Sequence, residues 1–190
     1  VPVEARFGPI ELLAVRFERT AAIPGSERDG LPVTLYWRPR AHTLADMSFY
    51  VQVLGLPGAD GEPALIGKID TYPGRGLLRT TQWDLDYIYA DRVEIRIERG
   101  ADAPVQPALK IGWRQFETGD EFAPETLAGA PRDPVIVRGG RVLGRSQTLS
   151  DGVESDALFG GALRLRTSRV TPESAAPGEA VEVWLEWTAR

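Results

Sequence analysis

The chain contains no cysteine and a single histidine among its 190 residues. The missing cysteines exclude disulfide bonds, thiol catalysis and cysteine metal sites, but they leave the cellular compartment open because an extracytoplasmic protein need not carry disulfides. His42 stands beside Thr43 in a polar stretch, without partners for a catalytic triad or a metal cluster. We therefore expect His42 to be an exposed loop residue, and we expect no metal and no cofactor.

Clusters of basic residues and long apolar runs are also missing. The formal net charge is −5, and a chain without a basic face is a poor partner for nucleic acid or an anionic membrane surface. No segment approaches the ~20 apolar residues of a membrane helix, and no signal-peptide pattern is present. Because the chain begins with Val1 rather than Met, we interpret it as a processed product or an excised fragment.

Apolar residues instead recur at every second position. Alternation or short apolar runs between Gly, Pro and Asp turn signals predict strands over residues 9–17, 31–37, 47–53, 64–70, 92–98, 107–116 and 134–143. Short strands separated by turns are typical of an all-β, antiparallel immunoglobulin-like β-sandwich. On the inward side of the pattern we expect a common core that includes Leu35, Trp37, Val51, Val53, Val93, Ile95, Ile97 and Ile111.

The opening of the chain occurs a second time at its end. Residues 7–40 align with residues 159–190 after a one-residue insertion and a three-residue deletion, which place Trp37 on Trp187. A period of about 150 residues is a domain, since solenoid units repeat every ~20–50 residues. We predict a β-sandwich domain over 1–144, a polar linker over 145–158 and a partial second copy over 159–190.

The partial copy predicts an uncovered apolar face. Two strands alone are marginal in water, and the inward residues of this segment are Leu163, Leu165, Val181, Val183, Leu185 and Trp187. We expect this face to be covered in one of two ways. The segment either docks on the first sandwich, or it self-associates with the same segment of another molecule through its strands.

A series of structural motifs carries a family resemblance over most of residues 5–144. They are residues 7–13 (FGPIELL), the Pro24-Gly25 turn before 31–37 (LPVTLYW), the strand 49–54 (FYVQVL), the lone Trp83, and 109–113 (LKIGW) before Thr118-Gly119. This succession resembles a β-sandwich domain appended, singly or in tandem, to bacterial multi-pass membrane proteins of the glycosyltransferase (protein-mannosyltransferase-like) type. The resemblance implies an extracytoplasmic domain tethered to the membrane through a parent protein, and it brings no catalytic residues. The long segment 122–134 departs from the pattern.

Acidic residues offer two further hypotheses. Asp84 with Asp86, and Glu117 with Asp120 and Glu121, supply the paired carboxylates that a glycosidase needs, although solvated strand faces carry the same residues. Asp151, Glu154 and Asp156 supply oxygen ligands of the type that calcium uses, but without the EF-hand spacing. We favour a solvated face for the first group and a flexible acidic linker for the second.

Aromatic residues offer the one binding hypothesis. The alternation assigns Trp37, Trp113 and Trp187 to cores, which leaves Trp83, Trp184 and Tyr36 as candidates for stacking on sugar rings. Three roles remain open for the Trp184 side chain: it packs between domains, it forms a platform for a ligand, or it is simply exposed.

The expected function is therefore non-catalytic. We predict a spacer, scaffold or interaction surface of a larger envelope-associated protein, with a protein or glycan of the cell envelope as its partner. The alternative is a carbohydrate-binding module using exposed Trp and Tyr side chains, and a more distant one is a small hydrolase using Asp and Glu.

Overall fold

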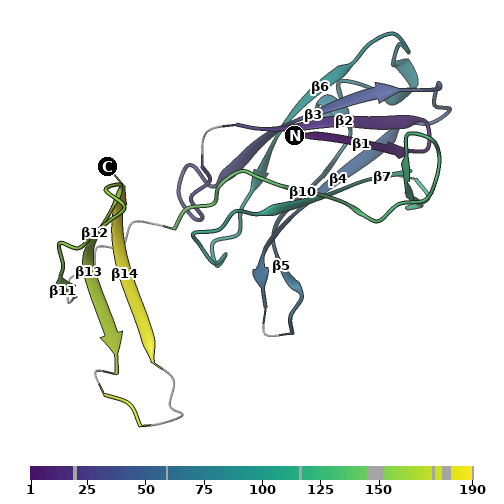
Figure 1. Cartoon of the computed structure of the whole chain (residues 1–190). Helices are drawn as coiled ribbons and strands as arrows, with labels where there is room; N and C mark the ends of the chain where they lie inside the picture. Colours follow the sequence, from purple (N-terminus) through teal and green to yellow (C-terminus); the bar gives the residue numbers. More distant parts are fainter. Residues whose placement is uncertain are drawn as a thin grey trace. The chain divides into compact units, whose positions relative to one another are not determined.

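The computed structural model describes residues 1–18, 21–58, 60–115, 117–144, 152–172, 174–176 and 181–189. It divides into two compact units, Val1–Arg145 and Ser146–Arg190 (Figure 1). No sheet is shared between the two units over the described residues. Among the described residues, no helix has the length and apolar character needed to cross a bilayer.

The first unit consists of two antiparallel sheets. One sheet has the strand order β6-β3-β2-β1-β9, and the other has the order β10-β7-β4-β5 with β8 paired to β7. The strands are β1 (Pro2–Phe7), β2 (Ile10–Phe17), β3 (Gly30–Pro39), β4 (Met47–Pro57), β5 (Pro63–Thr71), β6 (Tyr89–Arg96), β7 (Ala108–Gln115), β8 (Glu121–Phe122), β9 (Pro124–Thr126) and β10 (Val135–Arg138). An all-β architecture with antiparallel sheets, as the alternation predicted, is confirmed.

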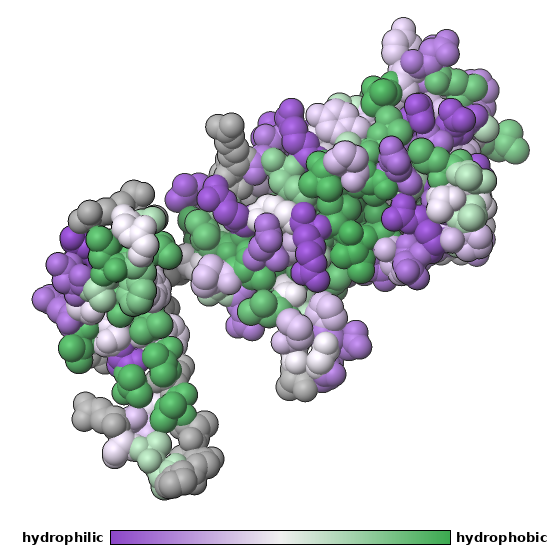
Figure 2. Space-filling view, in the orientation of Figure 1, coloured by the Kyte–Doolittle hydropathy of each residue, from purple (hydrophilic) through white to green (hydrophobic). Residues whose placement is uncertain are grey.

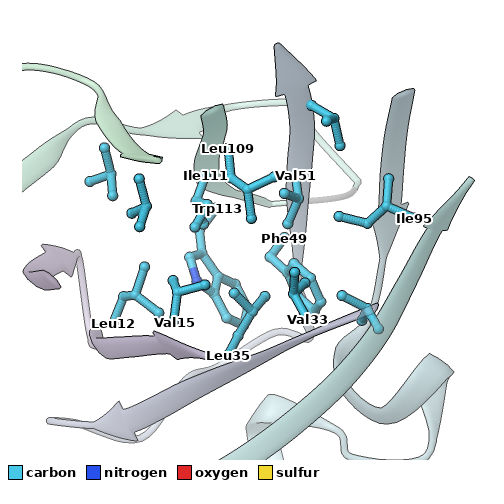
Figure 3. Close-up of a cluster of buried hydrophobic side chains, with 14 of the residues drawn as sticks. Leu12, Val15, Val33, Leu35, Phe49, Val51, Ile95, Leu109, Ile111 and Trp113 are labelled. Carbon is cyan, nitrogen blue, oxygen red and sulfur yellow. The ribbon is translucent and has the colours of Figure 1, made fainter. Parts of the chain in front are cut away.

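The core lies between the inner faces of these two sheets. Figure 3 shows Val33 and Leu35 of β3 beside Phe49 of β4 and Trp113 of β7. The rings of Trp37, Phe49 and Trp113 meet with centroids 4.9–5.6 Å apart. All eight residues expected in the common core are buried. The period of two therefore identified the inward face correctly, because a shift of one residue would expose all of these side chains.

The edge strands β5 and β6 bring the two sheets together at one side. Gly67 of β5 forms an antiparallel bridge with Ile97, just beyond β6. The amide of Glu98 donates to the carbonyl oxygen of Ile66 at 2.8 Å. A Cβ atom on Gly67 would lie 2.6 Å from the carbonyl oxygen of Arg96, so glycine permits the close approach of the two backbones.

The second unit is a small sheet, called the C-terminal sheet below. It contains β11 (Val153–Glu154), β12 (Leu158–Phe159), β13 (Leu163–Thr171) and β14 (Glu182–Ala189), and β13 pairs with each of the other three. Residues 153–154 and 158, which the sequence assigned to the polar linker, thus lie in strands of this unit. Residues 145–151, the first half of that linker, lie outside the described residues.

The pairing of β13 with β14 has the register of β2 with β3. Leu165 lies opposite Trp187 as Leu12 lies opposite Trp37, and a register shift follows directly in both pairs. On the other side of β13, Phe159 pairs with Leu163 as Phe7 pairs with Ile10. Large apolar side chains of this sheet are exposed, and Figure 2 shows hydrophobic residues at its surface.

Candidate functional site

Two connections of the first unit fold together into one ordered region. They are residues 40–46, between β3 and β4, and residues 72–88, between β5 and β6, which include the short 3-10 helices η1 (Pro73–Gly76) and η2 (Thr80–Gln82). Thr80 is buried between them, where its hydroxyl oxygen accepts from the amide of Met47 at 3.0 Å and from the Thr43 hydroxyl at 3.2 Å. The Thr81 hydroxyl also donates to Asp46 at 2.9 Å. Side-chain hydrogen bonds therefore fix both connections.

Trp83 anchors the longer connection to the core. Its ring is 3% exposed and stacks on Tyr89, with centroids 4.4 Å apart and planes at 10°. The indole Nε1 donates to the carbonyl oxygen of Leu78 at 3.2 Å. Because the side chain is buried, with one ring face on Tyr89 and its N–H group bonded to Leu78, Trp83 offers no exposed ring. This burial contradicts the hypothesis that Trp83 stacks on a sugar ring.

Asp91 holds the start of the same connection. One of its carboxylate oxygens, Oδ2, accepts from the amide of Gly74 at 3.0 Å, and the side chain is buried. Burial raises the pKa of Asp91, and the hydrogen bond from Gly74 and the charge of Arg75 offset part of this rise. Gly74 and Arg75 both have left-handed backbone angles, with φ of 59° and 56°. Arg75 therefore occupies a conformation that side-chain-bearing residues seldom adopt.

A hollow of about 590 Å³ opens at this region, called the polar hollow below. Its lining residues are His42, Thr81, Gln82, Trp83, Asp84, Leu85 and Asp86. The structure thus brings together His42 and the acid pair, which sequence reasoning treated separately. His42, Asp84 and Asp86 are all exposed.

The acid pair does not form the strand face that sequence reasoning considered. Residues 84–87 form a turn, in which the amide of Asp86 donates to Oδ1 of Asp84 at 3.0 Å. The polar hollow therefore presents carboxylate, amide and imidazole groups to solvent, which suits hydrogen bonding to a hydroxyl-rich ligand. Over the described residues, no group of three His, Asp or Glu side chains is close enough to hold a metal ion.

Apolar side chains project from the same two connections. Leu44 is fully exposed, Leu77 is 87% exposed, and Tyr87 and Ile88 are 62% and 57% exposed. We call these four residues the loop-end surface. Sequence reasoning missed them because they lie outside any alternating pattern. Their one sequence signal is the presence of large apolar residues in otherwise polar connections.

The second acidic group lies on another part of the first unit. The Tyr50 hydroxyl of β4 donates to Glu121 of β8 at 3.3 Å. Burial and the adjacent Glu121 carboxylate raise the pKa of Tyr50 to about 12. Glu117 and Asp120 are exposed, and the amide of Asp120 donates to the Thr118 hydroxyl. This group therefore forms a solvated turn and the edge of a sheet.

The remaining aromatic candidates differ in exposure. Tyr36 lies on the outer side of β3 between Ala14 and Ala90, and it is half-buried. Trp184 of β14 is 40% exposed, and the guanidinium carbon of Arg169 lies 5.6 Å from the centroid of its ring. Trp184 is therefore the most exposed of the three predicted aromatic residues, and its ring carries a cation–π contact.

Two of the three weak calcium candidates can be placed. Glu154 belongs to β11, where its backbone pairs with Thr167, and Asp156 forms an ion pair with Arg164 at 3.1 Å. Asp151 lies outside the described residues. The Asp156 carboxylate is therefore already engaged with a cation of its own chain.

Comparisons of the sequence with known proteins identify no related protein. A scan against protein-family models and a search of the curated proteins both return no match to this chain. Functional inference therefore depends on the polar hollow, the loop-end surface and the C-terminal sheet.

Proposed function

We propose that the chain is a non-catalytic, immunoglobulin-like module of a larger, extracytoplasmic, envelope-associated protein, and that its loop-end surface binds a protein partner. The observation that carries this proposal is the exposure of Leu44, Leu77, Tyr87 and Ile88 on connections that side-chain hydrogen bonds hold in place. Ordered, exposed apolar side chains are typical of the centres of protein interfaces.

The four exposed apolar side chains are not the ones that stabilise these connections, so they are free to contact a partner. The side chains that stabilise the connections, such as Thr80 and Trp83, point inward, whereas the four residues of the loop-end surface point to solvent. Burial of a large apolar side chain contributes about 1.5–3 kcal/mol. Removal of these four residues from water by a partner would therefore give a substantial part of a binding free energy.

The proposal also includes a tandem arrangement of sandwich domains. Its support is the common register of β2–β3 and β13–β14, together with the aligned positions of Trp37 and Trp187. In this proposal the first strands of a second copy span residues 153–189, whereas the sequence repeat alone predicted this copy over 159–190. A tandem module of this kind acts as a spacer or scaffold that carries the loop-end surface away from its point of attachment.

A photo-crosslinking experiment tests the proposed interface. A photoreactive phenylalanine replaces Tyr87, or as a control Leu65 of β5, and each chain is irradiated with solubilised bacterial envelope proteins. We expect a discrete crosslinked protein from position 87 that disappears in the Leu77→Ser/Ile88→Ser background. Equal crosslinking from positions 65 and 87, or persistence of the product in that background, would contradict the proposal.

A second candidate function is carbohydrate binding, which the polar hollow favours. His42, Gln82, Asp84 and Asp86 present several hydrogen-bonding groups around one opening. A glycan-array measurement separates this candidate from the first. Binding that is lost in Asp84→Asn and Gln82→Ala, and retained in Leu77→Ser/Ile88→Ser, would support the glycan and not the protein partner.

A further inference from the structure

The C-terminal sheet has two chemically different faces. On one face lie Leu163, Leu165, Val183, Leu185 and Trp187, which we call the inner face. The opposite face carries Arg164, Arg169, Trp184, Glu186 and Thr188. Apart from Leu165, the inner-face side chains are 41–54% exposed. Covering the apolar face of such a sheet is favourable, because it removes the apolar side chains from water.

The first unit shows what covers the matching face. The residues of β2 and β3 that align with the inner face are fully buried: Ile10, Leu12, Val33, Leu35 and Trp37. They share one buried cluster with residues of the opposite sheet that include Phe49 and Val51 of β4 and Ile111 and Trp113 of β7. The same backbone register therefore presents the same kind of apolar surface in both units, covered in one and exposed in the other.

The aromatic rings indicate which kind of sheet fits this face. In the first unit the Trp37 ring contacts Phe49 at 5.5 Å and Trp113 at 4.9 Å, and both rings come from the opposite sheet. In the C-terminal sheet the Trp187 ring contacts Phe159 at 5.2 Å, a ring of its own sheet. Two such sheets placed face to face would not supply the Phe49 and Trp113 rings.

We propose that the inner face of the C-terminal sheet binds a second antiparallel sheet whose inward residues have the pattern of β4 and β7. This inference rests on the tandem arrangement proposed above. The occupant is thus a complementary half-sandwich, with aromatic side chains directed at Trp187, and binding it completes a second two-layer core.

Thiol accessibility tests this proposal, because the chain has no cysteine of its own. Val183→Cys places a single thiol on the inner face, and Val33→Cys places one at the aligned, buried position of β3. Each variant is made in the full chain and in an extended chain that carries a copy of residues 41–144 directly after Arg190. Thr188→Cys, on the opposite face, is the control for general accessibility.

In the full chain we expect Val183→Cys to react rapidly with a thiol reagent and Val33→Cys to react slowly. In the extended chain the reaction of Val183→Cys should slow by ~100-fold or more, to the range of Val33→Cys. The reagent would then reach the thiol only after a packed core opens. The Thr188→Cys thiol should react at similar rates in both chains.

Three results would overturn the proposal. The first is an unchanged reaction rate of Val183→Cys in the extended chain. The second is protection of this thiol in the full chain when that chain has the mass of a dimer. The third is protection of this thiol in the full chain when that chain has the mass of a monomer. The second result would assign the face to self-association, and the third to docking on the first unit. The crosslinking test of the loop-end surface depends on residues 44–88 and is unaffected by any of these results.

Discussion

Asp91 shows how one side chain links the connection between β5 and β6 to the core. Its buried carboxylate accepts the Gly74 amide, so that it fixes η1 while it remains poorly solvated. Because its pKa in the folded chain is raised above the ordinary value of 3.8, the folded state retains this proton to higher pH than the unfolded state does. The contribution of Asp91 to the free energy of unfolding therefore falls as pH rises from 3.8 through the folded pKa.

Substitution of Asp91 tests this linkage. Asp91→Asn can keep the acceptor for Gly74 without the charge, so its stability relative to the natural chain should increase as pH rises across that window and then stay constant. Asp91→Leu should lower stability by about 1–3 kcal/mol, because the partly buried Gly74 amide loses its acceptor. Urea unfolding at several pH values measures both effects. A stability difference between Asp91→Asn and the natural chain that is independent of pH would contradict the raised pKa.

The two aligned tryptophans allow a second test at this scale. Trp37 is 0% exposed and Trp187 is 41% exposed. Trp37→Ala should reduce the free energy of unfolding of the first unit by about 3–5 kcal/mol, the range for a buried aromatic residue. Trp187→Ala should leave the unfolding of the first unit unchanged within about 0.5 kcal/mol. Near-ultraviolet circular dichroism in denaturant follows this unit, and equal effects of the two substitutions would be inconsistent with their different burial.

At the scale of elements, alternation was sufficient to predict the strands with a regular buried face. Val93, Ile95 and Ile97 illustrate this, since each is buried between exposed charged residues. The strands β1, β8 and β9 were not predicted, because they are short or interrupted and obtain their order from neighbours. The form of the two loop connections was also unpredictable. It depends on contacts between residues far apart in the chain, such as that of Thr80 with Met47.

The junction of β5 and β6 gives a prediction at this scale. Gly67→Ala should destabilise the first unit by about 1–3 kcal/mol, because its methyl group would meet the Arg96 carbonyl oxygen and force the sheets apart. Gly100→Ala is the matched control, since nothing lies within 4 Å of its Cβ position. Thermal unfolding of both variants provides the measurement. A Gly67→Ala chain that melts with the Gly100→Ala chain would show that the junction tolerates a wider spacing.

At the scale of the whole molecule, the chain combines one two-layer sandwich with a single-layer sheet of the same register. The C-terminal sheet begins at Val153, inside the segment 145–158 that the sequence assigned to a polar linker. The sequence did not reveal the polar hollow, because His42 and Asp86 come together only when two loops fold against each other. The functions proposed above depend on two exposed surfaces, namely the loop-end surface and the inner face of the C-terminal sheet.

Amide hydrogen exchange of the intact, monomeric chain tests the difference between the two units most directly. Residues 31–39 of β3 and residues 183–189 of β14 have matching registers, but only β3 is covered by a second sheet. We predict that the amides of 183–189 exchange at least ~100-fold faster than those of 31–39, because no packed core must open first. Equally slow exchange of the two segments in the monomer would contradict a single-layer C-terminal sheet with an unoccupied inner face.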